Sequence, residues 1–210
     1  MMLETDKNWA IPQSDFKTRE AYLSQLERAL PVLVKHSPLQ FIQWLDSTDE
    51  QVRFVAIETL SQFSDLLGDN SSTIPEIVEK HIYQCRNAGR FRELYQLIQL
   101  WQKITGQTHE LIHDANEILA FVVRHAFNDN ETEAYISLAF TIAEQNAIEL
   151  SSCHKKISLS NDESSSWIDY QIMVPCDEPL DKVFKMNLHL VDSAGDISKH
   201  VRQYMIVMFR

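Results

Sequence analysis

Apolar residues recur at helical spacing over most of the first 150 positions of the chain. Between Ser14 and Leu150 they return every three or four residues, as one buried face of an α-helix requires. Proline, glycine and capping residues divide the pattern into helices with short connections, which favours antiparallel helical hairpins. The predicted helices cover residues 14–36, a short segment from residue 38, and residues 48–67, 75–88, 91–105, 108–127 and 131–150.

Three glycines follow the apolar runs of this region. Gly68, Gly89 and Gly106 each stand where a helix commonly ends in a left-handed residue, so we expect a positive φ at all three. Thr48, with Gln51 three residues later, has the pattern of a capping box. It predicts a helix that starts at Thr48.

One helix pair carries a more specific pattern. Residues 37–63 place a proline-led apolar helix before a turn with two aspartates, and a second helix that opens with valine and arginine. The positions are Pro38, Leu39, Ile42, Leu45, Asp46, Asp49, Val52, Arg53, Ala56 and Leu60. This pattern resembles a unit of the HEAT repeat family. The resemblance implies that Asp and Arg tie neighbouring turns together, and that the other helix pairs are diverged units or a plain bundle.

The pattern changes after residue 150. Residues 151–166 are polar and Ser-rich, which predicts a linker or a surface loop. Three strand-like runs follow at residues 167–174, 183–191 and 202–209, separated by turn residues. They predict a three-stranded antiparallel β-meander over residues 167–210. The expected fold class is therefore α+β, mostly α, with a helical repeat-like domain over residues 1–150.

The last run is apolar on both of its faces. Ile206 and Met208 alternate with Val207 and Phe209, so neither side of the strand suits water. We expect one face to pack on the helices. Residues 151–166 or a second subunit would cover the other face, the latter giving a homodimer through these strands.

Charge and composition exclude several classes of partner. The net charge is −11, and residues 1–150 hold 22 acidic side chains against 12 Lys and Arg. This balance disfavours nucleic acid, which is bound through clustered cations. No apolar run approaches the length of a membrane span. Three widely spaced cysteines without a C-x-x-C pair, and no visible signal peptide, predict a cytoplasmic protein.

One short motif suggests chemistry. The stretch QTHELIHDANE contains H-E-x-x-H, in which His109 and His113 are spaced to hold zinc and Glu110 to act as general base. Glu133 follows twenty residues after His113. This arrangement resembles that of the gluzincin family. By that resemblance His109, His113 and Glu133 would bind zinc, and Glu110 would activate water.

The surroundings of the motif favour a plain surface helix. Gly106 and Thr108 suggest a helix boundary just before the motif, so His109 would lie in the first turn. Both histidines fall about 110–150° from the centre of the apolar stripe, on a side with Glu117 and Arg124, which is usually solvated.

These observations favour a non-catalytic protein–protein interaction module with an acidic surface and no cofactor. An inhibitor or immunity-type protein that masks a basic partner is one concrete form of it. A zinc-dependent metallopeptidase or hydrolase that uses the H-E-x-x-H motif is the alternative.

Overall fold

A computed structural model of the chain describes residues 42–64, 73–162 and 165–210. The chain divides into two compact units, Met1–Ser71 and Ser72–Arg210. The division therefore falls at residue 71 and not near residue 150. The expected helix over residues 14–36 and the expected turn at Gly68 lie outside the described residues. Where the structure describes it, the chain is mostly helical with a small sheet near its C-terminal end, which confirms the predicted fold class.

The described part of the first unit contains a 3-10 helix, η1 (Gln43–Asp46), and helix α3 (Glu50–Gln62). The predicted cap at Thr48 is wrong by one residue, because Asp49 is the N-cap and accepts a 2.9 Å hydrogen bond from the Gln51 backbone. The buried side chain of Arg53 donates to the Ser47 carbonyl at 2.8 Å. The arginine thus closes the turn that precedes its own helix.

The second unit begins with a helical hairpin, α5 (Thr73–Ala88) and α6 (Phe91–Thr105). Gly89 at the turn has φ +78°, and Gly106 after α6 has φ +67°, as predicted. Gly89 is constrained twice, because a Cβ at this position would also overlap the side chain of Ile136. Only glycine therefore fits the turn without a shift of its neighbour.

Two further helices follow, α7 (Ile112–Arg124) and α8 (Asp129–Gln145). The start of α8 is tied to the hairpin. The buried Asp129 carboxylate accepts hydrogen bonds from the backbone N–H groups of Arg92 and Glu93, at 3.0 and 2.9 Å. Thr132 donates to the Gly89 carbonyl at 2.6 Å. An acid from α8 thus caps α6 and fixes both elements to the same turn.

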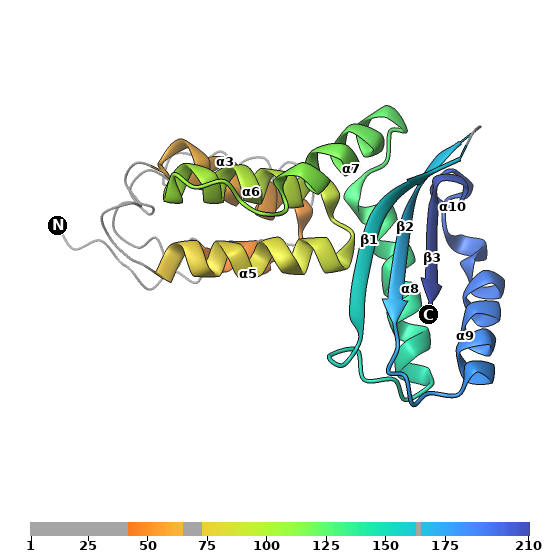
Figure 1. The fold of residues 1–210 in the computed structure, drawn as a ribbon. Helices are drawn as coiled ribbons and strands as arrows, with labels where there is room; N and C mark the ends of the chain where they lie inside the picture. The colour runs from red at the N-terminus through yellow and green to blue at the C-terminus, as the bar shows by residue number, and fades with distance from the viewer. Residues whose placement is uncertain (1–41, 65–72, 163–164) are drawn as a thin grey trace, which may run out of the picture. The chain divides into compact units, whose positions relative to one another are not determined.

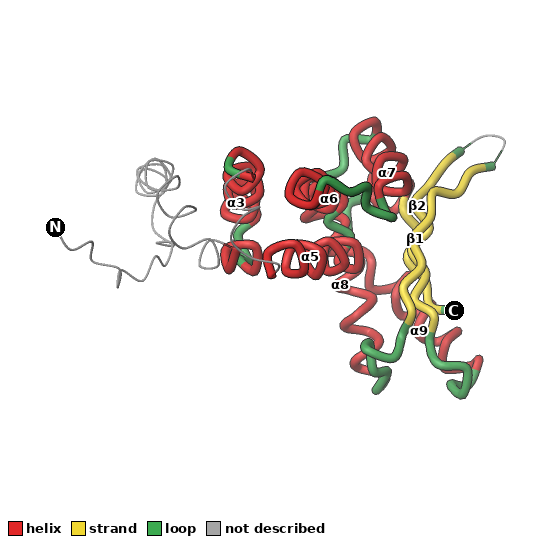
Figure 2. Tube along the Cα trace, turned by 60° about the vertical axis from the view of Figure 1, so that its left-hand side comes forward, coloured by secondary structure: helices red, strands yellow, loops and turns green. Residues whose placement is uncertain are grey.

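The sheet contains β1 (His154–Asn161), β2 (Ser166–Met173) and β3 (Met205–Phe209), in that order. β1 and β2 form an antiparallel hairpin (Figure 2), whereas β2 and β3 are parallel (Figure 1). The connection from β2 to β3 consists of α9 (Leu180–Ser193), the 3-10 helix η2 (Ala194–Asp196) and α10 (Lys199–Tyr204). A parallel pair needs such a crossover.

The predicted antiparallel meander is wrong in three places. Residues 154–161, expected in a linker or loop, form β1. Their serines lie on the face away from the buried Ile157, which gave the segment its polar composition. Residues 183–191, expected as a strand, lie in α9. Residues 202–204 belong to α10, so the last strand begins only at Met205.

One face of the sheet forms the core of the second unit. It consists of side chains that alternate along the three strands and are all buried: Ile157, Ile168, Tyr170, Ile172, Met205, Val207 and Phe209. α7 contacts β1, α8 contacts β3, and the Tyr170 hydroxyl donates to the Asn87 carbonyl of α5 at 2.6 Å. In Figure 1, α8 lies behind the strands and α9 runs beside β3. As predicted, one face of the last strand packs on helices.

Candidate functional site

The H-E-x-x-H motif does not lie within a helix. Helix α7 begins at Ile112, with Leu111 as its N-cap residue, so His109 and Glu110 precede it. The predicted start at Thr108 is therefore too early. Since α7 covers only the end of the motif, the two histidines do not lie one above the other on a helical turn, as a zinc-binding helix would place them.

His109 is buried, with 2% of its surface exposed, so the predicted solvated position is wrong. Its ring meets the ring of Trp101 edge-on, with centroids 5.0 Å apart. Nδ1 accepts a 3.1 Å hydrogen bond from the Leu111 N–H, which leaves the proton of the neutral ring on Nε2. In this state neither ring nitrogen offers a lone pair to a metal. Burial lowers the pKa of His109, against the smaller opposing effects of Glu79 and Glu110.

Glu110 is engaged by a neighbouring helix. Its carboxylate accepts a hydrogen bond from the hydroxyl of Tyr83 on α5, with 2.5 Å between the oxygens. This hydrogen bond is the main reason that the pKa of Tyr83 is raised, with burial adding to it. The residue that the gluzincin resemblance assigned to general-base catalysis thus connects the start of α7 to α5.

The other two predicted zinc ligands lie apart from His109. The His113 side chain is 81% exposed and pairs with Glu117 one turn later, at 3.4 Å between Nε2 and Oε1. Glu133 lies on α8, with its Oε1 atom 3.8 Å from Nε of Arg90. Over residues 42–64, 73–162 and 165–210, no three His, Cys, Asp or Glu side chains are placed to share a metal ion. The structure does not bring the predicted set together.

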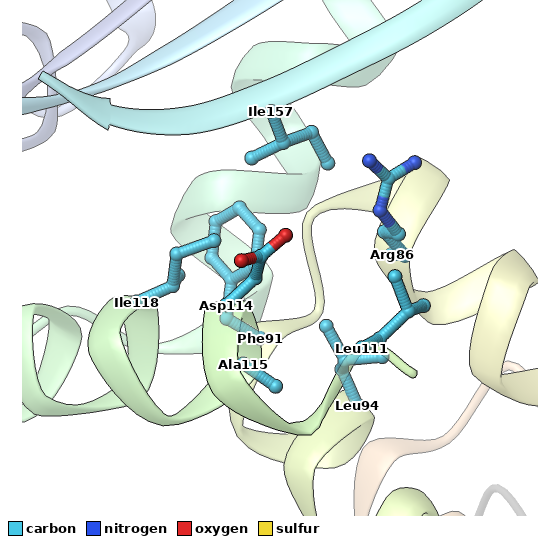
Figure 3. Close-up of a pocket in the computed structure, with 8 residues that line it drawn as sticks. All are labelled: Arg86, Phe91, Leu94, Leu111, Asp114, Ala115, Ile118 and Ile157. Carbon is cyan, nitrogen blue, oxygen red and sulfur yellow. The ribbon is translucent and has the colours of Figure 1, made fainter. Parts of the chain in front are cut away.

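A small pocket lies between α5, α6, α7 and β1 (Figure 3). Arg86 and Asp114 supply its polar groups, and the remaining lining is apolar: Phe91, Leu94, Leu111, Ala115, Ile118 and Ile157. The space among these side chains is about large enough for one water molecule. Arg86 also donates to the Lys155 carbonyl of β1 at 3.4 Å. This pocket is a packing defect between helices and sheet and has no room for an organic substrate.

Helix α9 presents large apolar side chains to solvent along one side. Leu180, Phe184, Leu188 and Val191 are 85%, 64%, 49% and 71% exposed. Their spacing of four, four and three residues places them on one face of the helix. We call these four residues the α9 stripe. In a protein of this size, exposed apolar residues are normally scattered, so a continuous row of four is typical of an interaction surface.

Residues outside the stripe fix α9 to the fold. Met186 and Leu190 are buried, and α9 contacts both α8 and β3. The Asn187 side chain makes two hydrogen bonds of 2.9 Å with Phe209, donating to its carbonyl and accepting from its N–H. Asn187 therefore occupies part of the free edge of β3, and the helix is held as a rigid support for the stripe.

Helix geometry places the stripe next to Asn187, on the side away from Met186 and Leu190. These two side chains are buried, and Asn187, about 80° further around the helix, bonds the edge of β3. The stripe begins about 20° beyond Asn187 in the same direction. On β3, Ile206 alternates with the buried Met205 and Val207 and is 38% exposed. The stripe and Ile206 therefore lie on neighbouring elements, since α9 runs beside β3 (Figure 1).

The sequence predictions missed this surface because the apolar residues of 183–191 fit both the alternation of a strand and the spacing of a helix. Met186, Leu188 and Leu190 alternate with polar residues, which is typical of a strand. In the helix, Met186 and Leu190 are buried whereas Leu188 is exposed. A longer window that included Leu180 and Phe184 would have shown the second, helical spacing.

No described helix has both the length and the apolar character needed to cross a membrane. No family model, curated protein or solved structure matches the chain. The resemblance of residues 37–63 to a HEAT unit therefore stays a prediction.

Proposed function

We propose that this protein is a non-catalytic protein-binding module and that the α9 stripe is its docking surface. The observation that carries this proposal is the exposure of four large apolar side chains along one helix face. Moving such a side chain from water into an interface contributes about 1.5–3 kcal/mol for full burial. Phe184, near the middle of the row, has the character of an interface hot spot.

The stripe is not needed to hold the fold together. α9 is already attached through Met186, Leu190 and the two hydrogen bonds of Asn187, none of which involves a residue of the stripe. Polar residues would serve equally well at the four exposed positions if the helix had no partner, because they would lower the risk of aggregation. A function in binding gives these side chains a reason to be apolar.

The residues of the H-E-x-x-H motif support the non-catalytic part of the proposal. His109 and Glu110 contact Trp101 and Tyr83, and His113 lies on the surface beside Glu117. These contacts account for His109 and Glu110 as part of the packing around α7 and for His113 as a surface residue. An inhibitor or immunity-type protein that masks another protein is one form that such a module takes.

A displayed library of amphipathic helical peptides tests the proposed surface. The full chain is the bait, and selected peptides are then measured by fluorescence anisotropy against the wild type and Phe184→Ser. The matched control is Val123→Ser, which alters a 56% exposed apolar residue on α7, away from the stripe. We expect Phe184→Ser to weaken binding at least tenfold, since a buried aromatic anchor contributes more than 1.4 kcal/mol.

Val123→Ser should leave the affinity of the same peptides unchanged. The proposal fails if no peptide is enriched, or if the enriched peptides bind Phe184→Ser as well as they bind the wild type. Circular dichroism of both variants checks that α9 is still folded.

A further inference from the structure

The α9 stripe has one free flank, and that flank is acidic. At about 100° per residue, the charged residues nearest to the stripe are Asp181 and Asp192, whereas Lys185 and His189 lie further around the helix. Both aspartates are exposed. Within the described part of the chain, neither carboxylate takes part in an ion pair. On the other flank, Asn187 and β3 close the surface.

The position of Asp192 is not explained by the stability of its own helix. Asp181 lies in the first turn of α9, where the positive end of the helix dipole favours an acid. Asp192 lies in the last turn, where the dipole favours a cation, and that turn contains no basic residue. An acid placed against the dipole, beside an exposed apolar row, suggests that its charge serves an external partner.

A second copy of this chain does not fit the surface. In an antiparallel pair, the stripe superposes on itself with Leu180 opposite Val191 and Phe184 opposite Leu188. The twofold axis of such a pair brings the same flank of both helices together. Asp181 of one copy would then lie within about one residue of Asp192 of the other, and the reverse, which places like charges side by side at both ends.

We infer that the occupant of the α9 stripe is an amphipathic helix of a partner protein, with an apolar face flanked by lysine or arginine. Two cations about 16 Å apart along that helix would meet Asp181 and Asp192, at a rise of about 1.5 Å per residue. A helix is the natural complement of a row spaced by four, four and three residues, because ridges of one helix pack into grooves of another. The inference rests on the proposed function and specifies its partner.

Two synthetic helical peptides test the charge of the partner. Both carry leucine at the spacing of the stripe, and they differ only at the flanking positions, which are lysine in one and glutamate in the other. Each is titrated with the full chain at low salt. We expect the lysine peptide to bind about tenfold more tightly, because two surface ion pairs replace two repulsions. Added salt should reduce this ratio.

The double variant Asp181→Lys/Asp192→Lys should reverse the preference and bind the glutamate peptide more tightly. This variant leaves the buried side of α9 unchanged, so its circular dichroism spectrum should match that of the wild type. Equal binding of the two peptides would overturn the inference and leave the proposed surface standing. If neither peptide binds better to the wild type than to Phe184→Ser, the proposed function itself fails.

Sedimentation velocity distinguishes the partner helix from a second copy. The wild type should remain monomeric at the concentrations used in the titration. A dimer that Phe184→Ser dissociates would show that the stripe binds another copy of this chain, and would overturn the inference.

Discussion

In residues 109–113 and in the α9 stripe, the type of residue and its solvent exposure disagree, and they do so in opposite directions. The first segment contains residues that suggest chemistry, and the structure uses two of them for packing: His109 is buried against Trp101, and Glu110 is bonded to Tyr83. The stripe consists of ordinary apolar residues, which the structure leaves in solvent. In this protein, the position of a side chain says more about its use than its chemical type does.

The difference arises from where each segment stands in its helix. His109 precedes α7, so its backbone turns the ring inward, away from the exposed face that carries His113. The stripe runs from the first residue of α9 to its last turn, and the buried side of that helix is already anchored. The comparison can therefore be tested by altering one buried and one exposed residue in each region and comparing the two variants.

The largest expected effect is a difference in stability between variants on the two sides of α9. Met186→Ala removes a fully buried side chain and should lower the free energy of unfolding by about 3 kcal/mol. Leu188→Ala, two residues away on the exposed side, should change it by less than about 0.5 kcal/mol. Urea denaturation of both variants measures the difference. Equal losses would show that the stripe is part of the core.

The next largest effect is a difference in stability between variants of the two histidines of the motif. His109→Ala empties a buried site beside Trp101 and should cost about 2 kcal/mol, whereas His113→Ala should cost less than about 0.5 kcal/mol. Isothermal titration with zinc provides the second measurement. Stoichiometric zinc binding that both substitutions abolish would contradict the separate roles given to these residues.

A pH titration sharpens the same comparison. Because burial lowers the pKa of His109 in the folded protein, the unfolded chain binds this proton more readily. The stability that the neutral ring contributes is present above the unfolded value of about 6.5 and decreases as the pH falls below it. We expect His109→Gln to make stability less dependent on pH between about 7 and 5. A slope remains in this variant, since the pKa of His125 is also lowered, mainly by burial. An unchanged slope would mean that His109 does not titrate as described.

The smallest effect concerns Asp192. Asp192→Asn removes an acid from the last turn of α9 and should stabilise the fold by about 0.3 kcal/mol, because the unfavourable interaction with the helix dipole is lost. The same variant should bind the lysine-flanked peptide more weakly. Thermal melting measures the gain in stability, and fluorescence anisotropy measures the loss of affinity. A variant that gains stability without losing affinity would remove Asp192 from the docking surface.

Local sequence signals predicted α5, α6, α7 and α8 as helices, whereas α9 and α10 were predicted to lie at least partly in strands. α6 has the predicted bounds, and Gly89 and Gly106 have the predicted positive φ, because helix ends depend on residues close in sequence. The sheet was predicted less well. Its parallel pairing and the role of α9 depend on contacts between β2 and β3, which local periodicity does not contain. The helical spacing of the candidate site could be found in a longer stretch of sequence, but its exposure could not, since exposure of Leu188 depends on where α8 and β3 lie.

The pairing of β3 has a consequence for the order of folding. β1 and β2 are joined by a short turn and can pair as soon as both exist, whereas residues 174–204 separate β2 from β3. Closing that longer loop costs more chain entropy, so we expect the third strand to join late. Asn187, within this connection, bonds the backbone of Phe209. We therefore expect α9 and β3 to dock onto the fold in the same step. In pulsed hydrogen exchange, the Phe209 amide should therefore gain protection together with α9 and after the β1–β2 hairpin.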